Sequence, residues 1–180
     1  MSRAGSHHEW LSTAWTDIDE RSLGVKVGDH RGQAVFEALV VLVAARAWAH
    51  LWESSFAEIT GQTDSMAVIG AHGKARSKSP AINMIVRELA LDAAVSPNGY
   101  SLTLKHLPGK ANLLADPLSR LMEPGSGATV PVALRNTARR EVAVRDERWW
   151  RTGSGPEVVE ELEAGDMAEH GPHGPDGATS

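Results

Sequence analysis

Helical and strand-like segments alternate between residues 34 and 121, and this alternation restricts the fold more than any other feature of the sequence. Apolar residues recur at helical spacing from Ala34 to about Leu51, and again over residues 81–95 behind Pro80. Residues 54–64 (SSFAEITGQTD) and 100–107 (YSLTLKHL) have the pattern of strands. Shorter helices are expected over residues 65–77 and 113–121. This order predicts an α/β fold in which helices cover a sheet.

The two ends of the chain differ from this middle region. Residues 9–15 (EWLSTAW) resemble a strand, and the polar stretch 16–33, with glycines at 24, 28 and 32, is expected to be a loop. Beyond Glu123 the periodicity gives way to glycine, proline, serine and acidic residues, a composition typical of disorder. We therefore expect one folded domain over residues 1–123 and a low-complexity, largely disordered acidic tail over residues 124–180. In that tail Trp149 and Trp150 are interpreted as exposed linker, with a short docking motif as the alternative.

Composition excludes several classes of site. The 180-residue chain has no cysteine, which excludes disulfides, thiolate metal sites and cysteine nucleophiles and fits a reducing compartment. The longest apolar segment, residues 35–51, is interrupted by charged residues, and the first residues lack the apolar core of a secretory signal. We expect an intracellular protein, in cytoplasm or nucleus, with no membrane partner. Residues 21–123 carry eleven basic against nine acidic residues, which permits a nucleic-acid partner there.

Three acidic residues fall at the ends of predicted elements. Glu37 lies in the first turn of a long helix, Asp64 directly after a strand, and Asp116 at the start of a short helix. Backbone at such places holds a carboxylate rigidly beside solvent, which suits a divalent cation. Each position also has a simpler explanation. The helix dipole favours Glu37, Asp64 is a candidate helix cap, and Asp116 before Pro117 has the pattern of a cap followed by a first-turn proline.

The segment HLPGKANLLADPLSR, residues 106–120, carries a more specific pattern. A histidine, an aliphatic residue, Pro-Gly, an asparagine, Ala-Asp and Leu-Ser-Arg follow one another at His106, Leu107, residues 108–109, Asn112, residues 115–116 and residues 118–120. With Glu37 opening the helix FEALVVLVAARAW and with TDSMAVI after a strand, the chain resembles the ribonuclease H domain of gypsy-type long-terminal-repeat retrotransposon polyproteins. The resemblance covers about Trp10 to Leu121.

This resemblance implies a ribonuclease-H-like mixed sheet flanked by helices and metal-dependent cleavage of the RNA strand of RNA–DNA hybrids. By matching positions, Glu37, Asp64 and Asp116 are expected as three of four carboxylate ligands of Mg²⁺, with Mn²⁺ as the alternative ion. His106 is expected to be the family's mobile histidine beside the last ligand, where an imidazole can handle a proton. A reverse transcriptase polypeptide is an expected partner.

The first carboxylate of the family has no counterpart in this chain. In the family it lies in the first, central strand of a five-stranded sheet, and too few residues precede Glu9 for two more strands and their turns. Asp17 and Asp19 fall in the expected loop, where the family has no ligand. We therefore expect a domain that lacks its first two strands, with an incomplete metal site and an unpaired strand edge.

Two functions follow as hypotheses. The first is hydrolysis of an RNA–DNA hybrid, inherited with the fold and reduced or lost in this chain. The second is a non-catalytic remnant that binds nucleic acid or protein. It is favoured by Lys74, Arg76 and Lys78, three bases on one expected loop that suit phosphate contact, although a solvated loop has the same composition.

Overall fold

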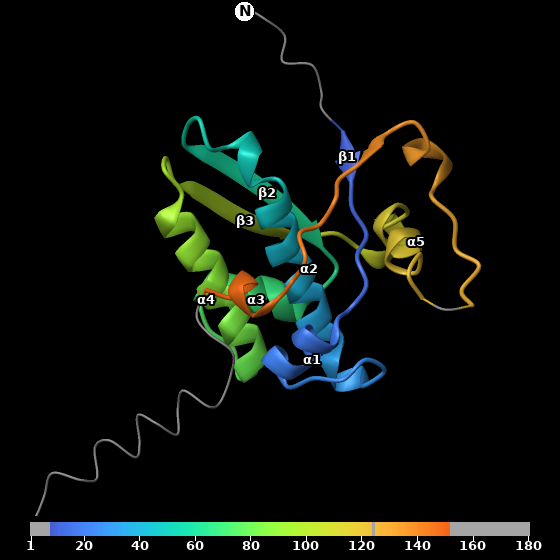
Figure 1. Cartoon of the computed structure of the whole chain (residues 1–180), viewed down its shortest axis with the longest axis horizontal. Coiled ribbons are helices and arrows are strands. Elements are labelled where there is room, and N and C mark those ends of the chain that lie inside the picture. Colours follow the sequence, from blue (N-terminus) through green and yellow to red (C-terminus); the bar gives the residue numbers. More distant parts are fainter. Residues whose placement is uncertain (1–7, 124, 152–180) are drawn as a thin grey trace, which may run out of the picture.

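The computed structural model describes residues 8–123 and 125–151 of the chain. It is a mixed α/β structure with two small parallel sheets, which confirms the α/β prediction at that level (Figure 1). In chain order the helices and strands are β1 (Glu9–Trp10), α1 (Asp17–Leu23), α2 (Gln33–Ala47), β2 (Ala57–Thr63), α3 (Met66–Lys74), α4 (Pro80–Val95), β3 (Tyr100–His106), α5 (Ala115–Ser119) and β4 (Ala138–Arg139).

The long helices α2 and α4 form the centre of the hydrophobic core. Leu42 of α2 and Ile85 of α4 are completely buried, and the two helices pack against each other. Helix α4 begins where the sequence predicted, because the Ser79 hydroxyl accepts the Ile82 N–H and Pro80 occupies the first turn. Helix α2 is apolar on almost every side and therefore needs cover on more than one face. Figure 1 shows it between α4 and the C-terminal segment.

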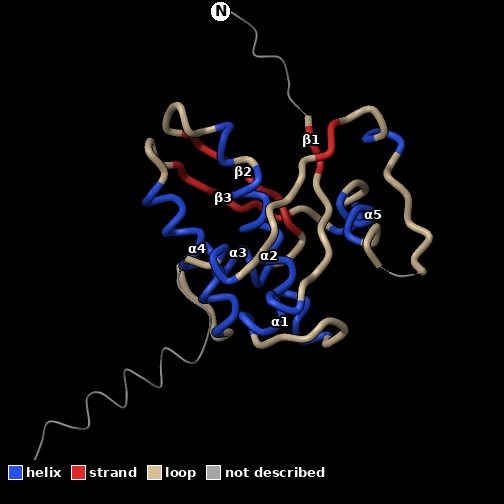
Figure 2. The backbone as a smooth tube through the Cα atoms, in the orientation of Figure 1, coloured by secondary structure: helices blue, strands red, loops and turns tan. Residues whose placement is uncertain are grey.

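Strands β2 and β3 pair in parallel, in unbroken register from Ala57 opposite Tyr100 to Thr63 opposite His106. The connection between them contains α3 and α4, as parallel pairing requires (Figure 2). Side chains alternate along both strands. One face packs towards α3 and α4, whereas residues 58, 60, 62, 101, 103 and 105 are exposed on the other. In the part of the chain that is described, no third strand joins this sheet.

The N-terminal region differs from the sequence prediction. Only Glu9 and Trp10 of the expected strand 9–15 are in strand conformation, and they pair with β4 rather than with β2 or β3. The expected loop over residues 16–33 contains α1. Thr16 and Asp19 form a reciprocal capping box at its start, and Gly24 ends it in left-handed conformation at φ 63°.

The expectation of a disordered tail does not hold for residues 125–151, which pack on the same core as the preceding domain. Trp150 is only 4% exposed and belongs to the main hydrophobic cluster, with Val142 and Trp149 packed against it. The segment returns past the N-terminal residues, where the Arg140 N–H donates to the Trp10 carbonyl at 2.7 Å. In Figure 1 this segment is the orange part of the chain that runs back across α2. Residues 124 and 152–180 of the expected tail lie outside the described residues.

None of the helices described is long and apolar enough to cross a membrane.

Candidate functional site

Asp64 and His106 lie together at the carboxyl ends of the parallel strands. Thr63 is in register with His106, and the Leu107 N–H donates to the Thr63 carbonyl at 2.9 Å, so Asp64 follows one strand where His106 ends the other. A Cβ atom added at Gly109 would lie 3.8 Å from Asp64 Oδ2. The loop after β3 therefore passes beside the Asp64 carboxylate. Ligands of α/β folds commonly bind at this end of parallel strands.

The carboxylate of Asp64 has no structural partner among the described residues. Helix α3 is capped by the next residue, because the Ser65 hydroxyl accepts the Val68 N–H at 3.4 Å. Asp64 is exposed and forms no hydrogen bond or ion pair with any described side chain. The capping explanation for Asp64 is thus replaced by Ser65. A free carboxylate is left at the strand ends, one residue beyond the position that is in register with His106.

Glu37 and Asp116 have local partners. Glu37 is half-buried in the second turn of α2 and not in the first turn as expected, because the helix already begins at Gln33. It accepts a hydrogen bond from the Gln33 side chain at 3.2 Å. Asp116 is exposed in α5 and forms an ion pair with Arg120 at 3.3 Å. Among the described residues, no group of three or more histidine, aspartate or glutamate side chains could hold a metal ion. The structure therefore brings Asp64 and His106 together but does not gather them with Glu37 and Asp116 into a cluster of that kind.

The described residues consequently do not fit Mg²⁺ as they stand. Magnesium requires near-octahedral oxygen coordination, and protein sites for it converge carboxylates on one point with water or substrate phosphate. Asp64 alone offers a free carboxylate at the strand ends, while the Asp116 carboxylate is shared with a guanidinium. A complete metal site would need oxygen ligands from another part of the polypeptide or from a partner.

Of the predicted nucleic-acid contacts, Lys74 is the last residue of α3 and not part of a loop, whereas Arg76 and Lys78 lie on the connection to α4. We call these three residues together the basic connection. All three side chains are exposed, and none is paired with a carboxylate of the described residues. The connection is itself held by α4, because the Asn83 side chain bonds to both the N–H and the carbonyl of Ser77. Helix α3 begins beside Asp64 and ends at Lys74, so its nine residues place Lys74 roughly 12 Å from the strand ends along the helix.

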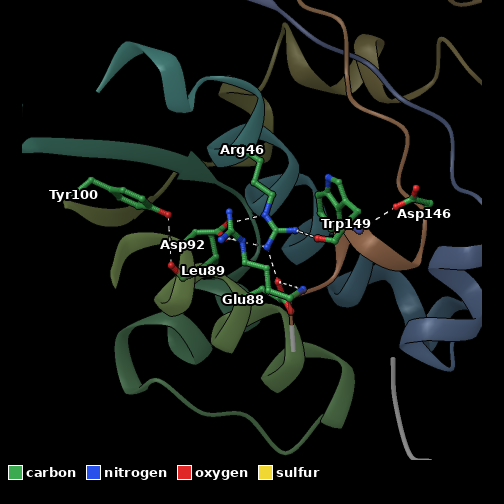
Figure 3. A network of polar contacts seen from close by, with 8 residues as sticks. Arg46, Glu88, Leu89, Asp92, Tyr100, Asp146 and Trp149 are labelled. Carbon is green, nitrogen blue, oxygen red and sulfur yellow. Dashed lines mark hydrogen bonds and ion pairs between the residues drawn. The ribbon is translucent and has the colours of Figure 1, made fainter. Parts of the chain in front are cut away.

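Sequence reasoning missed a buried polar network centred on Arg46 (Figure 3). Its guanidinium donates to Glu88 and to Asp92 on α4, the latter at 2.6 Å, and also to the Trp149 carbonyl. The same group stacks on the Trp149 ring, 4.2 Å from its centroid. Burial alone would lower the pKa of Arg46, but the hydrogen bonds that Arg46 donates to Asp92 and Glu88 outweigh it and raise that pKa. The sequence did contain a signal, since Glu88 and Asp92 stand four residues apart on the apolar side of α4, where a buried cation was to be expected.

A cleft of about 580 Å³ adjoins this network and includes Trp52, Asp92, Tyr100, Arg148 and Trp149 in its lining. The charged groups at this cleft form ion pairs with one another: Asp92 pairs with Arg46 and, at 2.8 Å, with Arg151. Burial raises the pKa of Tyr100 to about 12, and the negative charge of Asp92 acts in the same direction. The Tyr100 hydroxyl donates a hydrogen bond to the Leu89 carbonyl (Figure 3). We assign this region a structural role, because the network ties residues 149–151 to α2 and α4.

Comparison with known proteins gives no match to a family model, a curated protein or a solved structure.

Proposed function

We propose that this chain is a retroelement-derived, ribonuclease-H-like domain that binds nucleic acid, RNA–DNA hybrid in particular, without cleaving it unaided. The observation that carries the proposal is the placement of Asp64 and His106 at the same end of the parallel pair β2 and β3. The motif HLPGKANLLADPLSR supports the same proposal from the sequence. It begins with His106 at the end of β3 and continues into α5, which contains Asp116.

The element order supports the fold part of this proposal. A helix that carries Glu37 near its start precedes β2, two helices connect β2 to β3, and a short helix with Asp116 follows. The resemblance implies that order for the second half of a ribonuclease-H-like sheet. It also implies further strands beside β2, which the described residues do not contain.

Binding, rather than cleavage, is supported by the charges left free. Lys74, Arg76 and Lys78 are exposed and unpaired among the described residues, and phosphate contacts from such side chains supply most sequence-independent affinity for a duplex. Lys74 lies one length of α3, roughly 12 Å, from the strand ends, well below the roughly 34 Å of one helical turn of a duplex. One duplex can therefore reach the basic connection and the strand ends together.

A direct test measures binding of a labelled RNA–DNA hybrid by fluorescence anisotropy over a range of salt concentrations. The proposal expects affinity that falls with salt and that decreases when the three bases are replaced by glutamine. Binding that is independent of salt, or unchanged in the triple variant, would refute the assigned contact surface.

Metal-dependent hydrolysis is the second candidate, and the free Asp64 carboxylate beside His106 favours it. It requires oxygen ligands beyond those that the described residues gather. Cleavage in Mg²⁺ or Mn²⁺ that appears only when a reverse transcriptase polypeptide is added would support this candidate over simple binding.

A further inference from the structure

Strand β2 presents an open, hydrogen-bonding edge. In the β2–β3 ladder the Thr63 carbonyl accepts from Leu107, so alternate residues back along the strand, Gly61, Ile59 and Ala57, direct their N–H and C=O groups towards β3. The residues between them, Glu58, Thr60 and Gln62, must direct theirs outwards. No described residue forms a backbone hydrogen bond with these outward groups.

Apart from the single charge of Glu58, this edge also lacks the features that normally prevent strands from pairing. The seven residues AEITGQT contain no lysine, no arginine and no proline, and the register of β2 on β3 contains no bulge. Two exposed apolar side chains flank the strand: Phe56 is 60% exposed before it and Met66 is 64% exposed after it. An open edge of this kind favours addition of another strand.

The sequence of the edge is complementary to itself. When two copies of β2 are placed antiparallel about Thr60, residues whose numbers sum to 120 lie opposite each other, so Thr60 faces Thr60 and Glu58 faces Gln62 of the other copy. Carboxylate and amide are a compatible pair, and no like charges face each other. In this register the three outward residues of each strand become hydrogen-bonded pairs, which uses every outward N–H and C=O group.

We propose that two copies of this chain associate through their β2 edges, antiparallel and centred on Thr60, to form a continuous four-stranded sheet in the order β3, β2, β2, β3. The outward backbone groups supply the hydrogen bonds. At each end of the paired strands the same register sets Phe56 of one copy opposite Asp64 of the other, two residues before Met66. The association uses none of the three bases Lys74, Arg76 and Lys78, so the salt dependence of nucleic-acid binding tests the proposed function separately. It does occupy the edge of β2 at which the resemblance implies further strands, and its ends lie beside Asp64.

The register can be tested at Gln62, because substitutions there act oppositely on the monomer and on the dimer. Gln62→Glu places a carboxylate beside Lys105 within the monomer but opposite Glu58 across the dimer. Gln62→Lys places an ammonium group beside Lys105 within the monomer and opposite Glu58 across the dimer. With two symmetric pairs per dimer, we expect the dimer dissociation constant to rise roughly 2- to 30-fold in Gln62→Glu and to fall by a similar factor in Gln62→Lys.

The experiment is sedimentation equilibrium on the purified 180-residue chain, with circular dichroism to verify folding of every variant. Thr60→Pro removes an outward N–H at a position where an edge strand tolerates proline, and should shift the protein to monomer. Thr103→Glu is the control for Gln62→Glu. It adds the same negative charge on the same face of the sheet, but on β3, one strand away from the edge, and should leave the dimer intact. A chain ending at Arg151 should also dimerise.

A folded protein that stays monomeric at concentrations of order 100 µM overturns the proposal. So does a dimer that Thr60→Pro and the Gln62 variants leave unchanged, because it would use another surface. Monomer in the full chain together with dimer in the chain ending at Arg151 would show that residues 152–180 occupy the edge, which also contradicts the proposal.

Discussion

Arg145 and Asp19, separated by 126 positions in the chain, form a bidentate ion pair that is almost completely buried. Arg145 Nε lies 2.9 Å from Asp19 Oδ1 and Nη2 lies 2.7 Å from Oδ2. The guanidinium also donates to the Thr13 hydroxyl and to the Ala14 carbonyl. This pair fixes residues 125–151 onto the N-terminal helix α1, so the segment is a structural part of the domain.

Breaking this pair from one side should destabilise the fold strongly. Arg145→Met leaves the Asp19 carboxylate buried without a cation, and we expect the free energy of unfolding to fall by about 3–5 kcal/mol. Urea denaturation followed by circular dichroism measures the change. The double variant Arg145→Met with Asp19→Asn should lose less than the sum of the two single losses. A single-variant loss below about 0.5 kcal/mol, typical of exposed sites, would contradict the assigned burial.

Removal of the C-terminal segment should unfold the domain. A chain ending at Glu123 loses Arg145, Trp149 and Trp150, and with them the cation that pairs with Asp19 and the Trp149 contacts of Arg46. Since small domains are stable by only about 5–15 kcal/mol, we expect this chain to be largely unfolded at 25 °C. A chain ending at Arg151 is the control and should keep the thermal midpoint of the full protein. Equal midpoints for both truncations would restore the interpretation of residues 125–151 as a loose tail.

Stability should decrease in alkaline solution because of Tyr100. Burial raises its pKa to about 12 from the ordinary 10.0, so between these values the unfolded chain loses a proton that the folded chain keeps. The contribution is complete below pH 10 and is lost as the pH rises to about 12. As Tyr100 is only half-buried, solvent screening limits this loss to of order 1 kcal/mol.

Lysine and arginine also titrate in this alkaline range, so the measurement is the difference between the unfolding free energies of the wild type and Tyr100→Phe. A difference that does not vary between pH 9 and 12 would be the contrary result.

The basic connection should determine the salt dependence of nucleic-acid binding. Replacement of Lys74, Arg76 and Lys78 by glutamine should lower the slope of log affinity against log salt by up to about 0.9 for each lost phosphate contact. A matched control replaces Arg21, Lys26 and Arg135, which are exposed elsewhere on the described surface, and should change the slope little. The comparison requires anisotropy titrations at several salt concentrations. Equal slopes for both triple variants would mean that the affinity reflects overall charge rather than this connection.

Periodicity predicted the central elements because their burial is local in sequence. Ser79 and Pro80 marked the start of α4, and alternation marked β3. Helix α1 was missed because Gly24 was taken as a sign of loop, whereas it is the residue that ends the helix. That mistake gave the glycine more weight than the Thr16 and Asp19 capping pattern.

The packing of residues 125–151 could not be predicted from local patterns. This segment has little regular structure, and its burial depends on distant partners: Arg145 on Asp19, and Trp149 on Arg46. At the candidate site the sequence placed Asp64 and His106 at strand ends, and parallel pairing brings them together. Whether four separate side chains converge depends on how whole elements pack, and spacing along the chain does not determine that.

The most direct measurement incubates the purified 180-residue chain with a labelled RNA–DNA hybrid, first in Mg²⁺ and then in Mn²⁺, and follows both binding and cleavage beside an Asp64→Asn control. We predict salt-sensitive binding with the hybrid intact in both metals, equal for wild type and control. Cleavage by the wild type that Asp64→Asn abolishes would contradict the proposal, because it would mean that the protein assembles a complete catalytic site.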